Sequence, residues 1–386
     1  MSFPKIGVIG GGQLARMMAP EALNLGFELH VLAEGPDVSA ARCVPDAPIG
    51  DYKDLATLRA FAQGKDVVTF DHEHVPNEFL TTLINEGINV QPRPEALIHA
   101  QDKLVMRAAI EKLGLPNPAW AKVENTTELI AFGEQTGWPI VLKTPRGGYD
   151  GKGVRMLDNA EQAKDCEDWF AHGALLAEDK VEFTRELSAM VARTPSGETK
   201  AWPVVHTIQV AGVCDEVIAP AQDISDETAA TASQAAIRIA EEFGVTGVMA
   251  AELFETPGQG AGFVINELAM RPHNTGHWTM NGSVTSQFEQ HLRAVLDLPL
   301  GDTGALGLTV MKNFLGGTNQ DLYSAYQAAL AAAPEVKVHS YGKSVRPGRK
   351  IGHVNVVAAQ GQSVAVLRER ADAVASLIRD GISETA

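Results

Sequence analysis

The chain has 386 residues, enough for two or three domains with a large buried core. Hydrophobic residues make up 45% and charged residues 21% of the chain, as in ordinary soluble enzymes, and no apolar run reaches the roughly 18 residues of a membrane span. The formal net charge of −16 argues against nucleic acid or a membrane as a partner, because neutralising phosphates requires clustered cations.

The cysteines Cys43, Cys166 and Cys214 form no C-x-x-C pair, so the sequence indicates neither a disulfide framework nor a zinc knuckle. The start, MSFPKIGVIG, lacks the charged and apolar regions of a secretory signal. We therefore expect a cytoplasmic protein.

Residues 1 to about 100 alternate short apolar runs with helical segments. The runs are KIGVIG, FELHVLA, DVVTF and INVQP, and helical periodicity covers 13–25, 54–63 and 76–86. This order predicts a Rossmann-like domain, in which helices cover a parallel sheet. The prolines of QPRPEAL indicate a boundary, and a helix over 102–113 is expected after it.

The remainder of the chain mixes strand and helix patterns. Strands are predicted by WPIVLKT (138–144), the alternating tract 174–191, WPVVHTIQVAG, GVMAAELFE and GFVINEL, and a long helix by 226–243. The last 85 or so residues contain the basic turn YGKSVRPGRK and an amphipathic helix near 362–379. The expected fold class is α/β, with α+β parts.

The opening turn GGGQLARM follows the first predicted strand. Gly10, Gly12 and Ala15 fit G-x-G-x-x-A, and Glu34 lies shortly after the second apolar run, which permits a bound dinucleotide. A glycine turn at a helix start also offers N–H groups to any other anion, including a sugar phosphate. The turn alone leaves both ligands open.

A second glycine loop lies in VLKTPRGGYDGKGV. Lys143 ends a predicted strand, and Gly147, Gly148, Gly151 and Gly153 follow it. A cation beside a flexible glycine loop suits a triphosphate, although the pattern is not Walker A. A mobile hairpin tip with a surface lysine is the simpler interpretation of any one such loop.

Two acids lie in neighbouring predicted strands. A hairpin centred near Gln259 and Gly260 would bring Glu252 and Glu267 opposite each other on one face. Opposed carboxylates are destabilising unless a cation neutralises them, so the pair predicts a divalent metal site. The register is an assumption, since a bulge would offset the pair.

Three polar stretches remain. AMRPHNTGHWT combines cations, histidines and amides, which suits a phosphate, carboxylate or metal site. In DHEHVP, strand alternation would turn His72 and His74 one way and Glu73 the other, and two histidines are few ligands for zinc. The basic turn near Arg346 is interpreted as a phosphate site in this acidic chain.

These motifs, taken in order, resemble the ATP-grasp enzymes of purine biosynthesis called 5-(carboxyamino)imidazole ribonucleotide synthases. The resemblance rests on GGGQLARM, TFDHEHVP, QDK, VLKTPRGGYDGKGV, EDKV with RELS, MAAELF, INELAMRPHNTGHWT and RPGRKIGHV. It implies a Rossmann-like domain over 1–100, an ATP-grasp domain over 101–300 and a small C-terminal domain over 301–386. The ATP-grasp small lobe would cover about 115–182 and the large lobe about 183–300.

The resemblance also implies residue roles and a reaction, the carboxylation of 5-aminoimidazole ribonucleotide by bicarbonate and ATP through carboxyphosphate. ATP would contact Lys103, Lys143, Gly148, Tyr149, Asp150, Gly151, Lys152, Gly153, Val154, Glu178, Asp179, Lys180, Val181, Glu186, Asn266 and Glu267. Glu252 and Glu267 would hold two magnesium ions. The ribonucleotide would contact Gln13, Leu14, Glu73, Lys343, Arg349 and Lys350. Catalysis on bicarbonate would involve Arg271, His273, Asn274, Tyr149 and Arg155.

Three positions depart from the family pattern, and the family suggests a homodimer. Lys103 occupies a position where arginine is common, which keeps the charge but loses bidentate geometry. Gln209 lies where histidine is often found, and Met270 replaces a proline. We leave Gln209 out of the predicted site.

Two other functions stay in view. A ligase that joins formate to glycinamide ribonucleotide shares the glycine loop, the acid pair and the basic turn, but RPHNTGHWT favours the carboxylating enzyme. An NAD-dependent dehydrogenase is suggested only by residues 10–15 and Glu34. That function leaves Lys143 and the acid pair unexplained.

Overall fold

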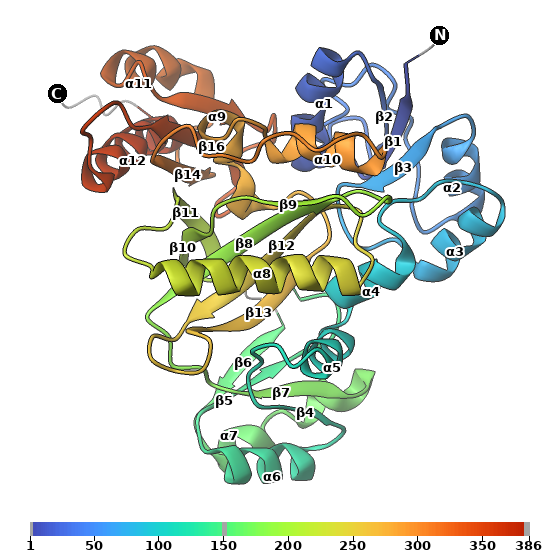
Figure 1. Cartoon of the computed structure of the whole chain (residues 1–386), viewed down its shortest axis with the longest axis vertical. Coiled ribbons are helices and arrows are strands. Elements are labelled where there is room, and N and C mark those ends of the chain that lie inside the picture. The colour runs from blue at the N-terminus through green and yellow to red at the C-terminus, as the bar shows by residue number, and fades with distance from the viewer. Residues whose placement is uncertain (1–2, 149–152, 382–386) are drawn as a thin grey trace.

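The computed structural model describes residues 3–148 and 153–381. In Figure 1 the N-terminal part (blue) and the C-terminal part (red) lie beside each other, above the green and yellow strands of a long central sheet. A small lobe, coloured teal, lies below that sheet. None of the helices in the described ranges is long and apolar enough to cross a membrane.

The N-terminal part is a parallel sheet with helices around it. Its elements are β1 (Lys5–Ile9), α1 (Gln13–Leu25), β2 (Glu28–Leu32), α2 (Leu55–Ala62), β3 (Val67–Phe70), α3 (Asn77–Asn85) and α4 (Pro94–Gln101). Within the described residues the strand order is β2-β1-β3, with parallel pairing on both sides of β1. Gly26 ends α1 with φ 78°, a left-handed conformation that glycine adopts without strain.

One local prediction in this part was wrong. INVQP forms only an isolated bridge between Val90 and Val68 rather than a fourth strand. QPRPEAL, which was interpreted as a boundary, leads into α4, with Pro94 in the first turn. Proline suits that position because the first helical N–H groups have no partner in the helix.

In the small lobe, helices α6 and α7 pack against an antiparallel sheet. Its elements are α5 (Lys103–Lys112), β4 (Trp120–Val123), α6 (Thr126–Thr136), β5 (Ile140–Lys143), β6 (Val154–Leu157), α7 (Ala160–Lys164), η1 (Glu167–His172) and β7 (Leu175–Asp179). The strand order in the described residues is β4-β7-β5-β6. Asp102 accepts hydrogen bonds from Leu104 N and Val105 N and so caps α5, which begins at Lys103.

The large lobe contributes the long sheet. Its elements are β8 (Arg185–Arg193), β9 (Thr199–Ala201), β10 (Val205–Val210), β11 (Val213–Ala219), α8 (Asp226–Glu242), β12 (Gly247–Glu255), β13 (Phe263–Ala269), η2 (Asn274–Gly276), α9 (Thr279–Gly282) and α10 (Gln287–Val295). Helix α8 covers one face of the sheet (Figure 1), and Ser225 caps it. The tract 174–191 was predicted as one strand. It divides into β7 and β8, which belong to different sheets.

The C-terminal part continues the same sheet. Its elements are β14 (Thr309–Leu315), η3 (Leu322–Ala325), α11 (Tyr326–Ala332), β15 (Lys337–Ser340), β16 (Lys350–Val357) and α12 (Val364–Asp380). Because β14 pairs with β11, the order over the described residues runs β13-β12-β8-β10-β11-β14-β16-β15. The predicted small C-terminal domain is therefore joined to the large lobe by backbone hydrogen bonds.

Candidate active site

A cavity of about 1300 Å³, here called the main cavity, lies between the small lobe, the β12–β13 hairpin and the N-terminal part. Most predicted site residues line it. These are Glu73, Lys103, Lys143, Gly148, Val154, Glu178, Asp179, Lys180, Val181, Glu186, Glu252, Asn266, Glu267, Arg271, His273, Asn274 and Lys350. Tyr149, Asp150, Gly151 and Lys152 lie outside the described residues.

The acid pair has the predicted register. Glu252 on β12 pairs directly with Glu267 on β13, and a register shift follows at Leu253. Burial, together with repulsion from Glu267 and Glu186, raises the pKa of Glu252 to about 8. Three carboxylates at one wall of the cavity therefore create a strong demand for positive charge.

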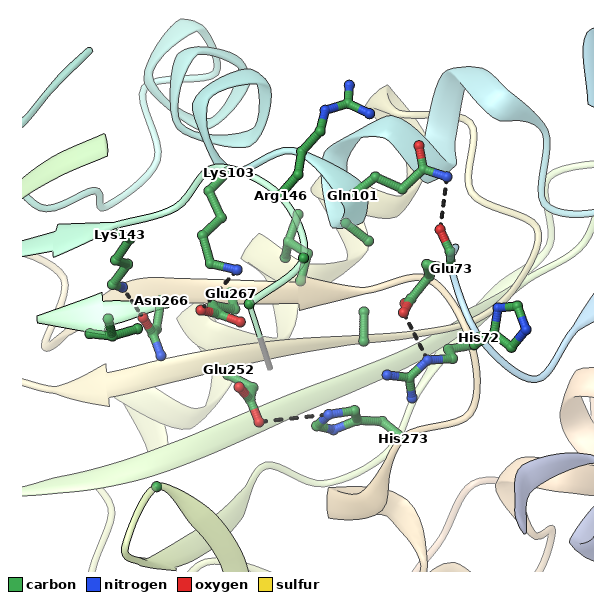
Figure 2. A pocket seen from close by; sticks show the side chains of 18 of the residues that line it. His72, Glu73, Gln101, Lys103, Lys143, Arg146, Glu252, Asn266, Glu267 and His273 are labelled. Carbon is green, nitrogen blue, oxygen red and sulfur yellow. Dashed lines mark hydrogen bonds and ion pairs between the residues drawn. The ribbon is translucent and has the colours of Figure 1, made fainter. Parts of the chain in front are cut away.

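Two lysines face this wall from the small-lobe side (Figure 2). Lys103 Nζ lies 3.3 Å from Glu267 Oε1. Lys143 Nζ donates to Asn266 Oδ1 at 3.3 Å and pairs with Glu178 Oε2 at 2.7 Å. Both lysine heads point into the space over the hairpin, where phosphate oxygens would find cations on one side and a metal on the other.

The donor chemistry at the hairpin fits magnesium. The two carboxylates and the Asn266 amide oxygen are hard oxygen ligands of the kind that Mg²⁺ takes. In residues 3–148 and 153–381, no group of three or more His, Cys, Asp or Glu residues is arranged to hold a metal alone. An ion at this place needs further oxygens, which the phosphates of a nucleotide would supply.

The segment after β13 is fixed to the N-terminal part. Glu73 Oε1 accepts from Met270 N at 2.9 Å, and Glu73 Oε2 accepts from Arg271 Nε at 2.9 Å. Gln101 Nε2 in turn donates to the Glu73 carbonyl at 2.9 Å (Figure 2). Glu73 thus holds the Arg271 guanidinium at the cavity wall as well as lining the cavity itself.

His273 points its ring toward Glu252 (Figure 2). Its Nδ1 contacts Thr275 Oγ1 at 2.9 Å, and its Nε2 lies 3.7 Å from Glu252 Oε1. Burial, with the nearby charges of Arg271 and Lys350, lowers the pKa of His273 well below its ordinary value. The imidazole is therefore neutral at physiological pH.

An apolar, aromatic part of the cavity wall suits an adenine base. Phe183 and Phe254 stack with ring centroids 4.4 Å apart, and both line the cavity together with Val181. Glu186 lies on the neighbouring strand, where burial raises its pKa and a hydrogen bond from Gln209 opposes that shift. Gln209, which was left out of the predicted site, thus belongs to the cavity wall.

Comparison with known proteins identifies this arrangement. Family models match a ribonucleotide synthetase preATP-grasp domain at residues 3–101, an ATP-grasp domain at 108–288 and a phosphoribosylaminoimidazole carboxylase C-terminal domain at 309–366. The chain is 50% identical to the N5-carboxyaminoimidazole ribonucleotide synthase of Mycobacterium bovis, over 98% of this chain and 88% of that protein. The chain belongs to the N5-carboxyaminoimidazole ribonucleotide synthase family. It is therefore an ATP-grasp ligase.

Solved structures of the synthase family agree. One, an ADP complex, superposes with a TM-score of 0.88 at 34% identity, covering 96% of this chain and 97% of that one. Another, from Aspergillus clavatus, is a complex with ADP and 5-aminoimidazole ribonucleotide. It superposes with a TM-score of 0.87 at 28% identity, covering 98% of this chain and 99% of that one.

The glycine turn of this synthase is already occupied by carboxylates. Gly11 N donates to Glu34 Oε2 at 3.0 Å, and Ala15 N donates to Asp71 Oδ1 at 2.8 Å. A Cβ on Gly12 would overlap the Asp71 carboxylate, so glycine is needed there for close approach. Two N–H groups that a dinucleotide pyrophosphate would need are thus already bonded to carboxylates, which argues against the dehydrogenase prediction.

The other predicted ribonucleotide contacts differ in where their side chains lie. Lys343 Nζ donates to Gln13 Oε1 at 2.5 Å, which joins the C-terminal part to the start of α1. The Leu14 side chain is buried in the hydrophobic core between α1 and α10, so only its backbone could face a ligand. Arg349 Nη1 donates to Ser344 Oγ at 2.9 Å and folds back on its own loop. Lys350 lines the main cavity.

Two predictions about side-chain direction were wrong. Arg155 lies over the Trp169 ring at 4.3 Å and donates to Cys166 Sγ, whereas its neighbours Val154 and Met156 line the cavity. Alternation along β6 therefore turns Arg155 to the opposite face. Residues 71–76 follow β3 instead of extending it, so His72 and Glu73 both line the cavity.

Sequence reasoning missed Arg107, which is fully buried on α5. Its guanidinium binds the Glu178 carboxylate, and it donates to the carbonyls of Ile265 and Asn266 at 2.7 and 2.8 Å. Burial opposes ionisation of Glu178, but Lys143 and Arg107 outweigh it and hold the pKa of Glu178 below its ordinary value. The sequence did offer one signal for Arg107, because it lies one helical turn after Lys103 and therefore on the same face of the helix.

Proposed function

We propose that this synthase uses ATP and bicarbonate to carboxylate the 5-amino group of 5-aminoimidazole ribonucleotide, in de novo purine biosynthesis. One observation carries the proposal. The acid pair Glu252 and Glu267, the lysines Lys103 and Lys143, and the Arg271–Asn274 segment all line one cavity. That arrangement suits a nucleotide triphosphate beside a small anion.

The first step is a phosphoryl transfer to bicarbonate, which is a poor electrophile by itself. A bicarbonate oxygen attacks the γ-phosphorus, the bond to the β-phosphate oxygen breaks, and ADP leaves with its electron pair. Lys103 and Lys143 offset the charge on the phosphate oxygens, since such transfers depend mainly on positioning and electrostatics. The products are ADP and carboxyphosphate.

Glu252, Glu267 and Asn266 are proposed to hold two Mg²⁺ ions, a role supported by the donor set and by the raised pKa of Glu252. Magnesium would supply charge neutralisation at the phosphates. Residues Gly148 to Val154 are proposed to cover the phosphates, and Glu186 to hold the ribose hydroxyls. Residues 178–181 are proposed to line the base.

The second step transfers the carboxyl group to the amine. The 5-amino nitrogen attacks the carbon of carboxyphosphate, or of the carbon dioxide that it releases. The bond from carbon to the phosphate oxygen breaks, and inorganic phosphate leaves with the proton that the amine loses. Arg271 is held by Glu73 and supplies positive charge at the anion. His273 is neutral and offers a ring nitrogen beside Glu252, and Asn274 lines the cavity beside them, next to the proposed place of the bicarbonate. Closure over the site would exclude water.

The ribonucleotide is proposed to lie between the N-terminal and C-terminal parts. Gln13 and Lys343 are already in contact there, and Lys350 reaches the main cavity from the same side. Phosphate monoesters bind best to such charge-assisted donors. We further propose that the enzyme is a cytoplasmic homodimer, on the strength of its family resemblance.

Substrate omission tests the proposed function. Purified protein is incubated with Mg-ATP, and phosphate release is measured with the ribonucleotide, with bicarbonate, with both and with neither. We expect rapid release only with both, together with one carboxylated product per phosphate. Release that the ribonucleotide does not stimulate would contradict the proposal. Glycinamide ribonucleotide with formate is expected to give no release, and turnover of that pair would assign the related transformylase reaction instead.

A further inference from the structure

The side-chain amide of Gln287 makes two hydrogen bonds to the backbone of His273. His273 N donates to Gln287 Oε1 at 2.8 Å, and Gln287 Nε2 donates to the His273 carbonyl at 2.8 Å. Gln287 has no exposed surface and is not among the described residues that line the main cavity. One side-chain amide therefore satisfies both backbone groups of a cavity residue without reaching the ligand space.

Gln287 is itself held firmly. It is the first residue of α10, and its backbone N donates to Thr279 Oγ1 at 2.9 Å. Its Nε2 also contacts His277 Nδ1 at 2.9 Å. Ser286 caps the helix and donates to Glu21 Oε1 at 2.7 Å, and Glu21 lies on α1. The clamp is thus built on a helix that packs against the N-terminal part (Figure 1).

The clamp and the ring contact together set the direction of the His273 imidazole. Fixing the backbone N–H and carbonyl fixes the Cα–Cβ direction, and Thr275 Oγ1 at 2.9 Å fixes the rotation of the ring. What remains is Nε2, directed at Glu252. A ring nitrogen that must meet a transient carboxyphosphate gains from such preorganisation, since a displacement of about 1 Å can cost about 100-fold in rate.

We propose that Gln287 is a positioning residue for His273, and that it acts on the bicarbonate half of the reaction through the His273 backbone. This inference rests on the proposed function. A purely structural role for Gln287 would lower the stability of the fold without changing how the bound anion is used. The two roles therefore differ in kinetics rather than in unfolding temperature.

The same helix supplies a matched control. Gln290 is equally buried, and its amide grips the backbone of Gly301 in the same way, with Gly301 N to Oε1 at 2.8 Å and Nε2 to the Gly301 carbonyl at 3.0 Å. Neither residue is among the described residues lining the main cavity. Gln287→Met and Gln290→Met each remove one buried amide clamp from α10, but only the first clamp holds His273.

The experiment compares these variants by steady-state kinetics and by the ratio of phosphate released to carboxylated product. We expect Gln287→Met to lower kcat/KM for bicarbonate about 10-fold to 100-fold and to raise the phosphate ratio above one, with the KM for ATP unchanged. Gln290→Met should keep wild-type kinetics despite a similar loss of stability. Equal kinetic behaviour of the two variants would overturn the inference.

A double-mutant cycle tests whether Gln287 acts through His273. In a His273→Ala background, Gln287→Met should lower kcat/KM for bicarbonate by less than about a further twofold, because the positioned ring is already gone. A full additional loss would refute the inference. If His273→Ala alone keeps the wild-type ratio of phosphate released to carboxylated product, the proposed role of His273 would instead be refuted. Should Gln287→Met not fold, Gln287→Glu keeps the acceptor for His273 N and loses the donor, and it should show the same defect in weaker form.

Discussion

Glu267 carries two roles in one carboxylate, because it faces Glu252 across the hairpin and lies 3.3 Å from Lys103. Glu267→Gln keeps the shape but removes the charge that a metal and the lysine both require. We expect the rate of phosphate release to fall by about 100-fold or more. The unfolding temperature of the variant should stay within a few degrees of that of the wild type. Retained activity at ordinary magnesium concentrations would show that the acid pair was wrongly assigned.

Glu252 gives the folded protein a pH dependence whose sign can be worked out. Its pKa rises from 4.5 to about 8 on folding, so between these values the folded state binds a proton that the unfolded state lacks. Stability therefore decreases as pH rises through this window. Glu252→Gln mimics the protonated form throughout.

Without magnesium, we expect the unfolding temperature of Glu252→Gln to exceed that of the wild type by a margin that widens from pH 5.5 to pH 8. Mg-ATP should narrow the margin, because the cation compensates the ionised carboxylate. Thermal unfolding across this pH range, with Glu198→Gln at an exposed acid as control, measures the effect. A margin that is constant with pH would argue against the raised pKa.

Prediction of single residues worked where strand pairing was local. The register of Glu252 and Glu267 follows from one short turn, so equal spacing from Gln259 was enough. Arg155 was misassigned because a resemblance transfers a residue but not the face of the strand on which it lies. Gln287 carries no local signal, since its partner His273 is separated from it by two further elements.

At the scale of elements, helix α5 fastens the small lobe to the large lobe. Arg107 reaches from α5 to Glu178 on β7 and to the carbonyls of Ile265 and Asn266 on β13. The same strands carry Asp179 and Glu267, which both line the main cavity. One buried guanidinium thus joins the two strands that carry opposite walls of the main cavity.

Arg107→Met should lower the free energy of unfolding by about 3 to 5 kcal/mol, because it leaves Glu178 charged and buried beside fewer partners. Arg107→Lys should recover little of this, since one ammonium cannot reach all the acceptors of a guanidinium. Urea unfolding checks both. Arg59→Met, which removes an exposed pair with Glu86, should lower the free energy of unfolding far less, and an equal loss in the two variants would contradict the role of Arg107.

Elements with local signals were predicted well, and those that depend on distant pairing were not. Helix α1 spans Gln13–Leu25 as expected, because apolar periodicity and the Gly26 cap lie within the segment itself. The tract 174–191 alternates through both β7 and β8. Alternation reports which side chains are buried, but it does not report which sheet a strand joins.

At the scale of the whole molecule, the N-terminal and C-terminal parts meet beside the cavity. Arg16 on α1 donates to the Ser340 carbonyl at 3.1 Å, and Ser39 Oγ donates to the Tyr341 carbonyl at 2.5 Å. Lys343 continues this joint to Gln13. The pairing of β14 with β11 holds the C-terminal part from the other side, and no short-range pattern could have predicted that pairing across so long a separation.

Lys343→Met tests this joint as a ribonucleotide site. We expect the KM for 5-aminoimidazole ribonucleotide to rise about 10-fold, because a charge-assisted phosphate contact is lost, while the KM for ATP stays within about twofold. Arg349→Met should raise the ribonucleotide KM less, since Arg349 is bonded to Ser344 within its own loop. Equal effects on the two substrates would indicate loss of structure rather than of a binding contact.

In the proposed reaction, bicarbonate attacks ATP in the cavity before the ribonucleotide is carboxylated. Bicarbonate labelled with ¹⁸O tests it most directly, because the attacking oxygen remains on phosphorus when the carboxyl group is transferred. With unlabelled water and ATP, we predict one ¹⁸O atom in each phosphate released during coupled turnover, measured by mass spectrometry. Unlabelled phosphate alongside a labelled carboxyl group would contradict the claim.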